Sequence, residues 1–405
     1  MGGLWRRAAI SFSLAAVLVT SAAASELFDA CAEAAASKYE PGYEGVGPVG
    51  AGSFNSYDAI DACKLALAED PASIRVKAWL GNAYVANDEV AKGVPLLEDA
   101  AAAGNVVAET ALADLLILGK GIARDYARGN GLLLEAAKAG FVPASLSLAY
   151  SYDFGDGVAA DPAQAFKYYL AAADGGIVRA QLVVADRYHR GVGVAQSDVE
   201  AFTWLARAAD SQDPEAQYRL GVAYLEGRGV EANTAKALEA FQASSDQYYH
   251  PGMTALGYMT LQGIGIDASP AAASDLFSSA KSSDAPLASY DLALLQEEGN
   301  GIGQDLASAR QNYQDAATAG EMRAAVNLAL MELKGEGGPV DTAAAVEWLS
   351  KAAAAGNATA QNNLGRLHEL GLGVEADLGR ARALYGQATA QGYDLAKQNL
   401  ARLGG

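Results

Sequence analysis

The sequence is organised around a short unit that is clearest at residues 216–235, AQYRLGVAYLEGRGVEANTA. A helical pattern runs to Glu226, the loop Gly227-Arg228-Gly229-Val230 follows, and a second helical pattern begins after it. Glycine pairs of this kind recur every 36 residues, at Gly119/Gly121, Gly155/Gly157, Gly191/Gly193, Gly227/Gly229, Gly263/Gly265, Gly299/Gly301, Gly335/Gly337 and Gly371/Gly373. A fixed period of roughly 20 to 50 residues is typical of repeat proteins whose units bury apolar faces against their neighbours.

Each unit contains the signals of two helices. Counted from eleven residues before the first loop glycine, position 1 is alanine in seven units and glycine in one, and position 5 is Leu or Val. This i, i+4 stripe predicts a first helix with one buried face, to which Tyr152, Tyr188 and Tyr224 at position 9 would add. An N-cap residue type follows every loop and predicts the start of a second helix, at Asp125, Asp161, Ser197, Asn233, Ser269, Asp305, Asp341 and Asp377.

The order Ala-x3-Leu-Gly-x2-Tyr, Gly-x-Gly-Val, Asp and Ala-Ala resembles the Sel-one-like repeat family, a branch of the tetratricopeptide-type solenoids, most closely at residues 216–230 and 360–374. The resemblance implies an all-α fold, a right-handed α-solenoid of stacked antiparallel helix pairs. We expect eight repeats over residues 108–395 and a C-terminal capping helix over 396–405. Two copies depart from the pattern and are expected to pack more loosely: one has Gly338-Pro339 in its loop, the other has Ser244-Ser245 in place of Ala-Ala.

The N-terminal residues 1–24, MGGLWRRAAISFSLAAVLVTSAAA, combine a basic start, a short apolar run and small residues. This order predicts a secretory signal peptide cleaved after Ala24 or Ser25. The alternative is a membrane anchor, but the apolar run is shorter than the roughly 20 residues that a span requires. We expect an exported protein without membrane insertion of the mature chain. The leader ahead of such repeats resembles periplasmic proteins of the family from Gram-negative bacteria, so we expect the protein in the periplasm or outside the cell.

Residues 25–107 are predicted to form an N-terminal cap of two cysteine-bearing helices and a tetratricopeptide-like helix pair. An exported chain with only Cys31 and Cys63 is expected to join them in one structural disulfide. Two buried free thiols are the alternative, and a metal site without a nearby His is disfavoured. The glycines at residues 45–50 match a dinucleotide-binding pattern, but without a preceding strand they indicate a flexible connector.

Composition and motifs argue against several functions. The formal charge of -19 disfavours nucleic acid and anionic membranes, which bind clustered Lys and Arg. The three histidines, His189, His250 and His368, fall in different repeats, and no catalytic signature is found. We therefore expect no enzyme activity, no catalytic residue, no metal and no cofactor. The loop glycines are expected to be structural turns, not phosphate cradles, because no Lys-Ser/Thr follows them.

The residues most available for binding lie at positions 3, 7 and 10 of each first helix, which form one stripe on the expected concave face. The stripe is apolar in the middle of the array, as binding hot spots are, with acids such as Asp153 and Glu297 at its margin. Alternatively, these side chains pack between successive first helices. The predicted partner-binding residues are Leu146, Tyr150, Asp186, His189, Tyr218, Val222, Tyr258, Tyr290 and Leu294.

These observations favour a protein-protein interaction scaffold in the cell envelope. Its partner would be a protein or a peptide of basic or amphipathic character, and it would regulate an envelope complex or a sensor kinase. The alternative function is a cell-wall-active enzyme that binds or hydrolyses peptidoglycan or a β-lactam, or a sugar-binding module.

Overall fold

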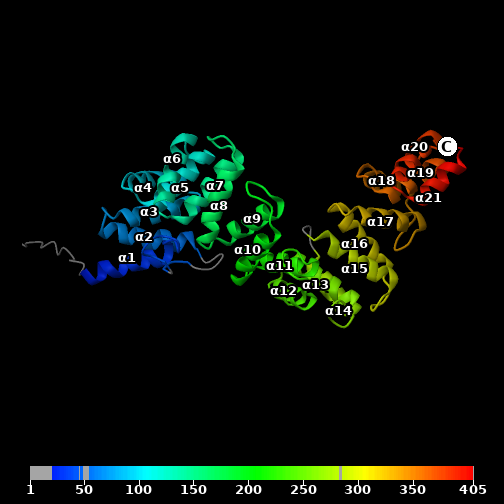
Figure 1. The fold of residues 1–405 in the computed structure, drawn as a ribbon, viewed down its shortest axis with the longest axis horizontal. Helices are drawn as coiled ribbons and strands as arrows, with labels where there is room; N and C mark the ends of the chain where they lie inside the picture. Colours follow the sequence, from blue (N-terminus) through cyan, green and yellow to red (C-terminus); the bar gives the residue numbers. More distant parts are fainter. Residues whose placement is uncertain (1–20, 45, 49–53, 282–284, 405) are drawn as a thin grey trace, which may run out of the picture. The chain divides into compact units, whose positions relative to one another are not determined.

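The computed structural model describes residues 21–44, 46–48, 54–281 and 285–404, with side chains from residue 25 onward. These residues form helices and no strands (Figure 1). The helices are α1 (Ser21–Ala35), α2 (Ser56–Glu69), α3 (Ile74–Ala86), α4 (Val90–Ala102), α5 (Val106–Leu118), α6 (Tyr126–Lys138), α7 (Val142–Phe154), α8 (Pro162–Asp174), α9 (Val178–Arg190), α10 (Asp198–Asp210), α11 (Pro214–Glu226), α12 (Thr234–Asp246), α13 (His250–Gln262), α14 (Pro270–Ala280), α15 (Pro286–Glu298), α16 (Leu306–Thr318), α17 (Met322–Lys334), α18 (Thr342–Ala354), α19 (Ala358–Leu370), α20 (Leu378–Ala390) and α21 (Asp394–Arg402).

The expected signal peptide lies almost entirely outside the described residues, since α1 begins at Ser21. Among the helices that are described, none combines the length and the apolar character that a bilayer crossing needs.

The chain divides into two compact units, residues 1–196 and 197–405. In the first unit each helix from α1 to α9 packs against the next, and in the second the same holds from α10 to α21. Additional contacts join first helices of successive pairs, α3 to α5, α5 to α7 and α11 to α13. Each unit is therefore a stack of helix pairs with the first helices side by side, as the 36-residue period predicts.

The two glycines of each loop have different roles. The first ends the first helix in the left-handed conformation, as at Gly227 (φ 70°), where its N–H donates to the carbonyl of Ala223. The second, Gly229 (φ 71°), lies against the preceding repeat, and a Cβ there would be 1.9 Å from the carbonyl oxygen of Asp198. The residue before α12, Asn233, then caps that helix by accepting a hydrogen bond from the N–H of Lys236. The loops are structural turns because positive φ and close approach both require glycine.

The second glycine makes the same close approach in other repeats, always to the first residue of the second helix one repeat earlier. The nearest atoms that a Cβ would meet are Tyr126 Cβ at 2.2 Å from Gly157, the carbonyl oxygen of Pro162 at 2.0 Å from Gly193, and Thr234 Cγ2 at 2.8 Å from Gly265. The expectation that Gly157, Gly193 and Gly265 are turns was therefore incomplete. These glycines also pack against the preceding repeat. The spacing of the glycines in the sequence does not show this contact.

Alanine and leucine of the first helices form the core, as expected. Position 1 is buried in all eight repeats, and position 5 in seven. Leu220 is the exception and is only half-buried. Leu220 was expected on the same buried stripe, and the structure leaves it partly exposed.

Ser244, in the copy expected to pack loosely, is fully buried. Its hydroxyl donates a 2.7 Å hydrogen bond to the carbonyl of Pro214. In the next repeat Gly252 replaces the usual alanine, and a Cβ there would be 2.2 Å from Ser244 Oγ. The glycine therefore makes room for the hydroxyl, and the expectation of looser packing was wrong for this copy. In the other departing copy, Arg310 Nη1 donates a 3.0 Å hydrogen bond to the carbonyl of Pro339.

The N-terminal cap contains the predicted disulfide, which joins Cys31 of α1 to Cys63 of α2. Both cysteines are fully buried. Nearby, Trp79 of α3 donates a 2.7 Å hydrogen bond from Nε1 to Glu40. Burial raises the pKa of Glu40, while Trp79 and Arg75 act against that increase. The connector before α2 is thus held to α3 by the buried Glu40 carboxylate, while the disulfide joins α1 to α2.

Candidate functional site

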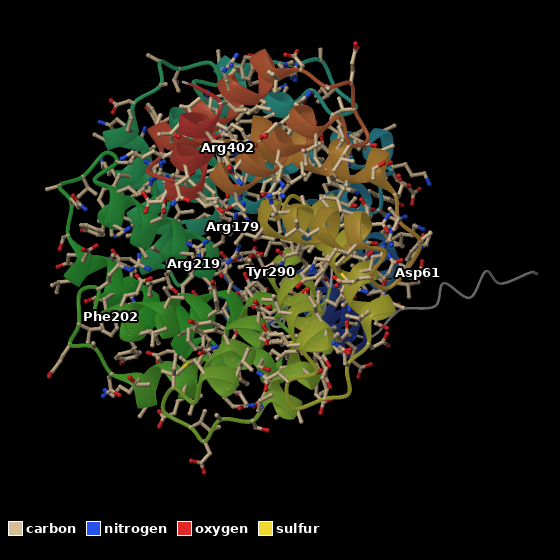
Figure 2. The ribbon with its side chains drawn as sticks, turned by 90° about the vertical axis from the view of Figure 1, so that its right-hand side faces the viewer. Asp61, Arg179, Phe202, Arg219, Tyr290 and Arg402 are labelled. Carbon is tan, nitrogen blue, oxygen red and sulfur yellow. A yellow bond between two sulfur atoms is a disulfide. The ribbon has the colours of Figure 1, made fainter. Side chains whose placement is uncertain are left out.

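The second unit contains an open pocket of about 580 Å³ whose walls come mainly from three successive first helices, α11, α13 and α15. Arg219 and Tyr290 mark α11 and α15, two of these three helices, in Figure 2. The volume is within the range of about 300 to 1,000 Å³ that is common for ligand pockets. The lining residues are Tyr218, Val222, Leu225, Glu226, Phe241, Pro251, Thr254, Ala255, Tyr258, Met259, Ala285, Pro286, Leu287 and Asp291.

The pocket has a packed apolar floor and an exposed apolar rim. Phe241 and Met259 in the floor are each 1% exposed. On the rim, Leu225, Tyr258 and Leu287 are 37%, 49% and 44% exposed. Large apolar side chains that remain exposed around a concavity are typical of protein interaction sites. The exposed rim favours an interaction site over a filled core at this position.

Two acids line the pocket, and their surroundings differ. Glu226 is exposed and forms an ion pair with Arg228 at 2.5 Å. Asp291 is half-buried, and burial raises its pKa to about 6, although Arg323 acts against this increase. Within the described part of the chain, no hydrogen bond or ion pair is made by the Asp291 carboxylate. Among the described residues, the pocket therefore contains one partly desolvated carboxylate that forms no ion pair.

The structure gathers some of the predicted groove residues and separates others. Tyr218, Val222 and Tyr258 line the pocket together. Tyr290 and Leu294 are half-buried and do not line it; the Tyr290 ring packs against Tyr313, with centroids 5.9 Å apart. The remaining predicted residues belong to the first unit and are half-buried there: Leu146, Tyr150, Asp186 and His189.

The predicted loop glycines lie outside the pocket. Those that follow α11 and α13 come directly after helices of its wall, yet none of them lines it: Gly227, Gly229, Gly263 and Gly265. The others belong to the first unit and are Gly155, Gly157, Gly191 and Gly193. All eight have positive φ. Their contribution to the site is indirect, because they fix the spacing of the helices that form it.

Within the first unit the expected stripe is largely engaged in packing. The Tyr150 ring meets Tyr169 edge-on at 5.7 Å, and its hydroxyl accepts a 2.9 Å hydrogen bond from Arg179. Leu182, which shares the stripe, is 8% exposed, so its expected place on an open groove was wrong.

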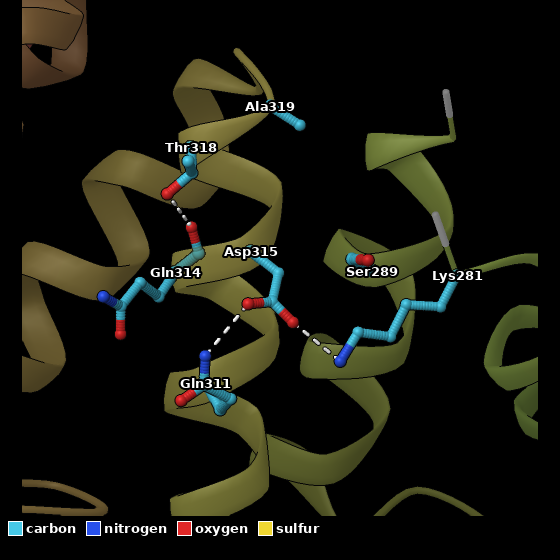
Figure 3. Close-up of a pocket in the computed structure, with 7 residues that line it drawn as sticks. All are labelled: Lys281, Ser289, Gln311, Gln314, Asp315, Thr318 and Ala319. Carbon is cyan, nitrogen blue, oxygen red and sulfur yellow. Dashed lines mark hydrogen bonds and ion pairs between the residues drawn. The ribbon is translucent and has the colours of Figure 1, made fainter. Parts of the chain in front are cut away.

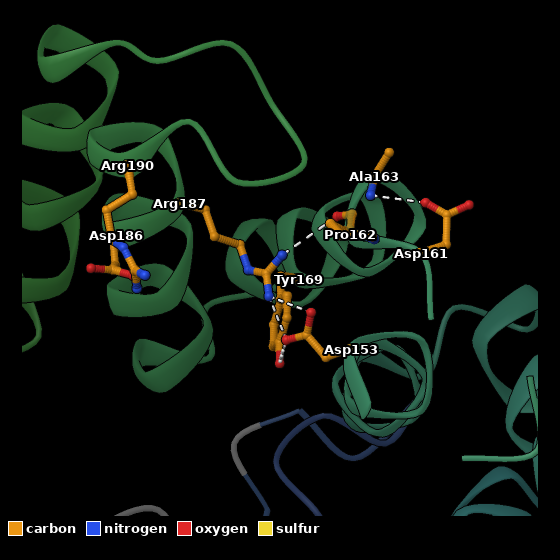
Figure 4. A network of polar contacts seen from close by, with 8 residues as sticks. All are labelled: Asp153, Asp161, Pro162, Ala163, Tyr169, Asp186, Arg187 and Arg190. Atoms are coloured by element: carbon orange, nitrogen blue, oxygen red, sulfur yellow. Dashed lines mark hydrogen bonds and ion pairs between the residues drawn. The ribbon is translucent and has the colours of Figure 1, made fainter. Parts of the chain in front are cut away.

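The acids expected at the margin of the groove have a structural role instead (Figure 4). Asp153 of α7 accepts a 2.8 Å hydrogen bond from the hydroxyl of Tyr169 in α8, and an ion pair joins it to Arg187 of α9. The Arg187 guanidinium also lies over the Tyr169 ring, 4.7 Å from its centroid. Burial, followed by the hydrogen bond to Asp153, raises the pKa of the Tyr169 hydroxyl. These contacts link three successive helices, so Asp153 is occupied.

The same arrangement recurs in the second unit. Tyr313 donates a 2.6 Å hydrogen bond to Glu297, and Tyr385 donates a 2.7 Å hydrogen bond to Glu369. Glu369 also pairs with Arg402 of α21, and hydrogen bonding to Arg402 lowers the pKa of Glu369 to about 2. Sequence reasoning missed these pairs. Their signal was present, because each acid lies sixteen residues before its tyrosine.

A second, more polar cavity of about 450 Å³ adjoins α14, α15 and α16 (Figure 3). Lys281 pairs with Asp315 at 2.7 Å, and Gln311 donates a 2.9 Å hydrogen bond to the same carboxylate. Its charged groups therefore satisfy one another, and we do not assign a ligand to it.

Among the described residues, no three His, Cys, Asp or Glu side chains lie close enough together to bind a metal ion. His368 is buried in α19, while His189 and His250 are half-buried in α9 and α13. The structure gathers the apolar pocket residues and leaves the histidines on separate helices.

Stacked helix pairs joined by left-handed glycine turns define an α-solenoid of the tetratricopeptide class. The Sel1 repeat model matches eight consecutive segments, residues 106–141, 142–177, 178–213, 214–249, 250–284, 286–321, 323–357 and 358–393. The chain belongs to the Sel1 repeat family. Proteins built from these repeats generally act as scaffolds that bind other proteins and are typically not enzymes.

Two solved structures illustrate the similarity. One is a protective antigen present in uropathogenic Escherichia coli strains that displays an SLR fold; it is 26% identical, and the match covers 86% of this chain and 83% of that chain with a TM-score of 0.58. The other is a Sel1 repeat protein from Oxalobacter formigenes, 29% identical over 76% of this chain and 89% of that chain, with a TM-score of 0.62. No significant match is found among curated proteins.

Proposed function

We propose that this protein is a non-enzymatic scaffold of the cell envelope that receives a protein or peptide segment in the pocket between α11, α13 and α15. The observation that carries the proposal is the exposed apolar rim around that pocket, formed by Leu225, Tyr258 and Leu287. Burying such side chains against a partner is favourable by about 25 cal/mol for each Å² of apolar surface removed from water. A partner segment would gain this energy without rearrangement of the helices.

An envelope location is supported by two independent features. The first 24 residues have the composition of a secretory leader. The cap contains a disulfide, and such bonds persist mainly in oxidising compartments such as the bacterial periplasm. We propose the periplasm of a Gram-negative bacterium or the extracellular space as the location, where the scaffold would regulate an envelope complex or a sensor kinase.

Site-specific photo-crosslinking tests the pocket directly. A benzophenone amino acid replaces Tyr258 on the pocket rim, and in a matched control it replaces Val199, an exposed apolar residue of the same unit outside the pocket. Illumination of intact cells is expected to give one discrete adduct with a protein from position 258 and none from 199. Fractionation of the same cells should place the adduct in the envelope.

Two variants complete the test. Changing Tyr258 and Leu287 to Ser should weaken the adduct formed from a benzophenone at position 225, with little change in melting temperature, because exposed substitutions usually cost within about 0.5 kcal/mol. Equal adducts from positions 258 and 199, or an adduct that survives the double change, would count against the pocket as the docking site.

A further inference from the structure

Asp291, which lines the pocket, indicates what kind of chemical group the pocket can bind. This residue is on α15, next to the half-buried Tyr290, and its carboxylate adjoins a mostly apolar cavity. A carboxylate that loses part of its hydration without gaining a partner is destabilising, so such groups are normally paired. Within the described residues, Asp291 is not paired.

The cations near Asp291 are committed elsewhere. Arg323 pairs with Glu321 through two hydrogen bonds of 2.9 and 3.0 Å, and its guanidinium stacks over the Tyr290 ring at 4.6 Å. The other acid of the pocket, Glu226, is paired with Arg228. No basic side chain lines the pocket as the described residues form it. A cation for Asp291 would therefore come from the occupant.

We infer that the pocket selects a peptide segment in which a large apolar side chain stands next to a lysine or arginine, and that Asp291 recognises the cationic group. This inference rests on the proposed function and specifies its partner. The apolar floor and rim would hold the apolar side chain, while the charge on Asp291 would favour a cation beside it. An acidic segment would place like charges together in a chain whose formal charge is already -19, which is unfavourable.

The inference predicts that affinity depends on pH in a defined direction. Burial raises the pKa of Asp291 to about 6 in the free protein. The carboxylate is therefore charged at pH 7.5 and mostly neutral at pH 5, whereas lysine stays charged at both. The titratable and charged groups around it are Arg323 and Glu321 from the start of α17, Tyr290 on its own helix and Glu226 of α11. Affinity for a cationic peptide should fall about tenfold between pH 7.5 and 5.

The test uses the purified protein with its disulfide intact and a phage-displayed library of random dodecapeptides. Selection on the wild type is expected to yield a consensus with a large apolar residue beside Lys or Arg. Fluorescence anisotropy with one such peptide should show at least a tenfold loss of affinity for Asp291→Asn. Replacing the cationic residue of the peptide by norleucine should cost the same on the wild type and little further on Asp291→Asn. The pH dependence should disappear in that variant.

A Tyr258→Ser/Leu287→Ser variant separates the two claims. If selected peptides depend on Tyr258 and Leu287 but bind Asp291→Asn as tightly as the wild type, or lack a cation, the inference about Asp291 is wrong while the docking site stands. If no selected peptide depends on Tyr258 and Leu287, the docking site itself is wrong. Melting temperature measured for each variant identifies any loss of binding that comes from unfolding.

Discussion

Tyr169 donates a 2.8 Å hydrogen bond to Asp153, a residue sixteen positions earlier in the same helix pair. The relationship holds across the repeats of this one chain: where the earlier position is Asp or Glu, the later one is Tyr, and where the earlier one is apolar or His, the later one is Phe or Leu. The pairs are Ile117/Leu133, Asp153/Tyr169, His189/Leu205, Leu225/Phe241, Leu261/Phe277, Glu297/Tyr313, Leu333/Leu349 and Glu369/Tyr385. The residue types at the two positions therefore vary together across the repeats.

Removing the hydroxyl of Tyr169 tests the stability that this pair supplies. Tyr169→Phe is expected to lower the free energy of unfolding by about 1 to 2 kcal/mol, because a buried hydrogen bond to a carboxylate is lost. Tyr152→Phe is the matched control, since Tyr152 is half-buried and stacks on Tyr168 without a side-chain hydrogen bond in the described structure. Urea unfolding followed by circular dichroism measures both. Equal stability of the two variants would show that the Tyr169 hydroxyl contributes nothing.

The second loop glycine is expected to be less tolerant than the first. A Cβ at Gly229 would be 1.9 Å from the carbonyl oxygen of Asp198, whereas one at Gly227 would first meet Ala232 Cβ at 3.3 Å. Gly227→Ala should cost about 1 to 2 kcal/mol, the strain of a left-handed alanine. Gly229→Ala should cost at least about 1 to 2 kcal/mol more, because overpacking adds to the same strain. Denaturant midpoints that reverse this order would contradict the packing account.

Asp114 of α5 is expected to destabilise the protein at neutral pH. Burial raises its pKa to about 6 from a usual value of 3.8, with hydrogen bonding to Ser147 acting in the opposite direction. A pKa that is higher in the folded state means that folding takes up a proton as the pH falls through 6, so this group favours the folded state more at pH 4 than at pH 7.5. Asp114→Asn should therefore raise stability at pH 7.5 by about 1 to 3 kcal/mol.

The difference in free energy of unfolding between Asp114→Asn and the wild type should shrink toward zero near pH 4, because the wild-type carboxyl is then neutral as well. Unfolding curves at pH 7.5, 6 and 4.5 measure it. A constant difference across this range would show that Asp114 does not titrate as described. Ser147→Ala serves as a control for the loss of the hydrogen bond alone and should be destabilising.

Tyr248 occupies a turn position that is glycine in several other repeats. Its φ is 58°, and its side chain is 78% exposed. Tyr248→Gly is expected to stabilise the protein by about 0.5 to 1 kcal/mol, since relief of left-handed strain exceeds the added entropy of the unfolded chain. Gly140→Ala is the reverse control at φ 86°, where a Cβ would meet no atom within 4 Å, so it should destabilise through the backbone alone. If thermal melts do not show a higher melting temperature for Tyr248→Gly and a lower one for Gly140→Ala, the Tyr248 backbone is not strained.

The parts of the fold that could be predicted depend on local chemistry. Glycine at a left-handed turn, Asp or Ser at an N-cap and an i, i+4 apolar stripe each act within one repeat, so their period was sufficient to place helices and loops. The disulfide could be predicted as well, because the chain has only two cysteines to pair. The candidate site was harder. Residues that share a stripe on their helices were all predicted to bind a partner. In the structure, Tyr258 is exposed on the pocket rim, whereas Tyr290 packs on Tyr313.

Asp291 was outside the predicted stripe altogether. It is at position 4 of its repeat, and it lines the pocket because the approach of α13 and α15 brings it there. The residue pattern of a single helix does not predict which other helices it contacts, nor which side chains lose their hydration at those contacts.

The contact between Ser244 and Gly252 also restricts how this gene can change. Arrays of similar copies gain and lose units by unequal recombination, which joins the end of one copy to the beginning of another. Ser244 is near the end of the copy at residues 214–249, and Gly252 begins the copy at residues 250–284. Any crossover that places an alanine-led copy after Ser244 brings a methyl group to 2.2 Å from its hydroxyl. Serine at position 244 and glycine at position 252 are therefore compatible as a pair, whereas serine at 244 followed by alanine at 252 requires one of the two helices to shift.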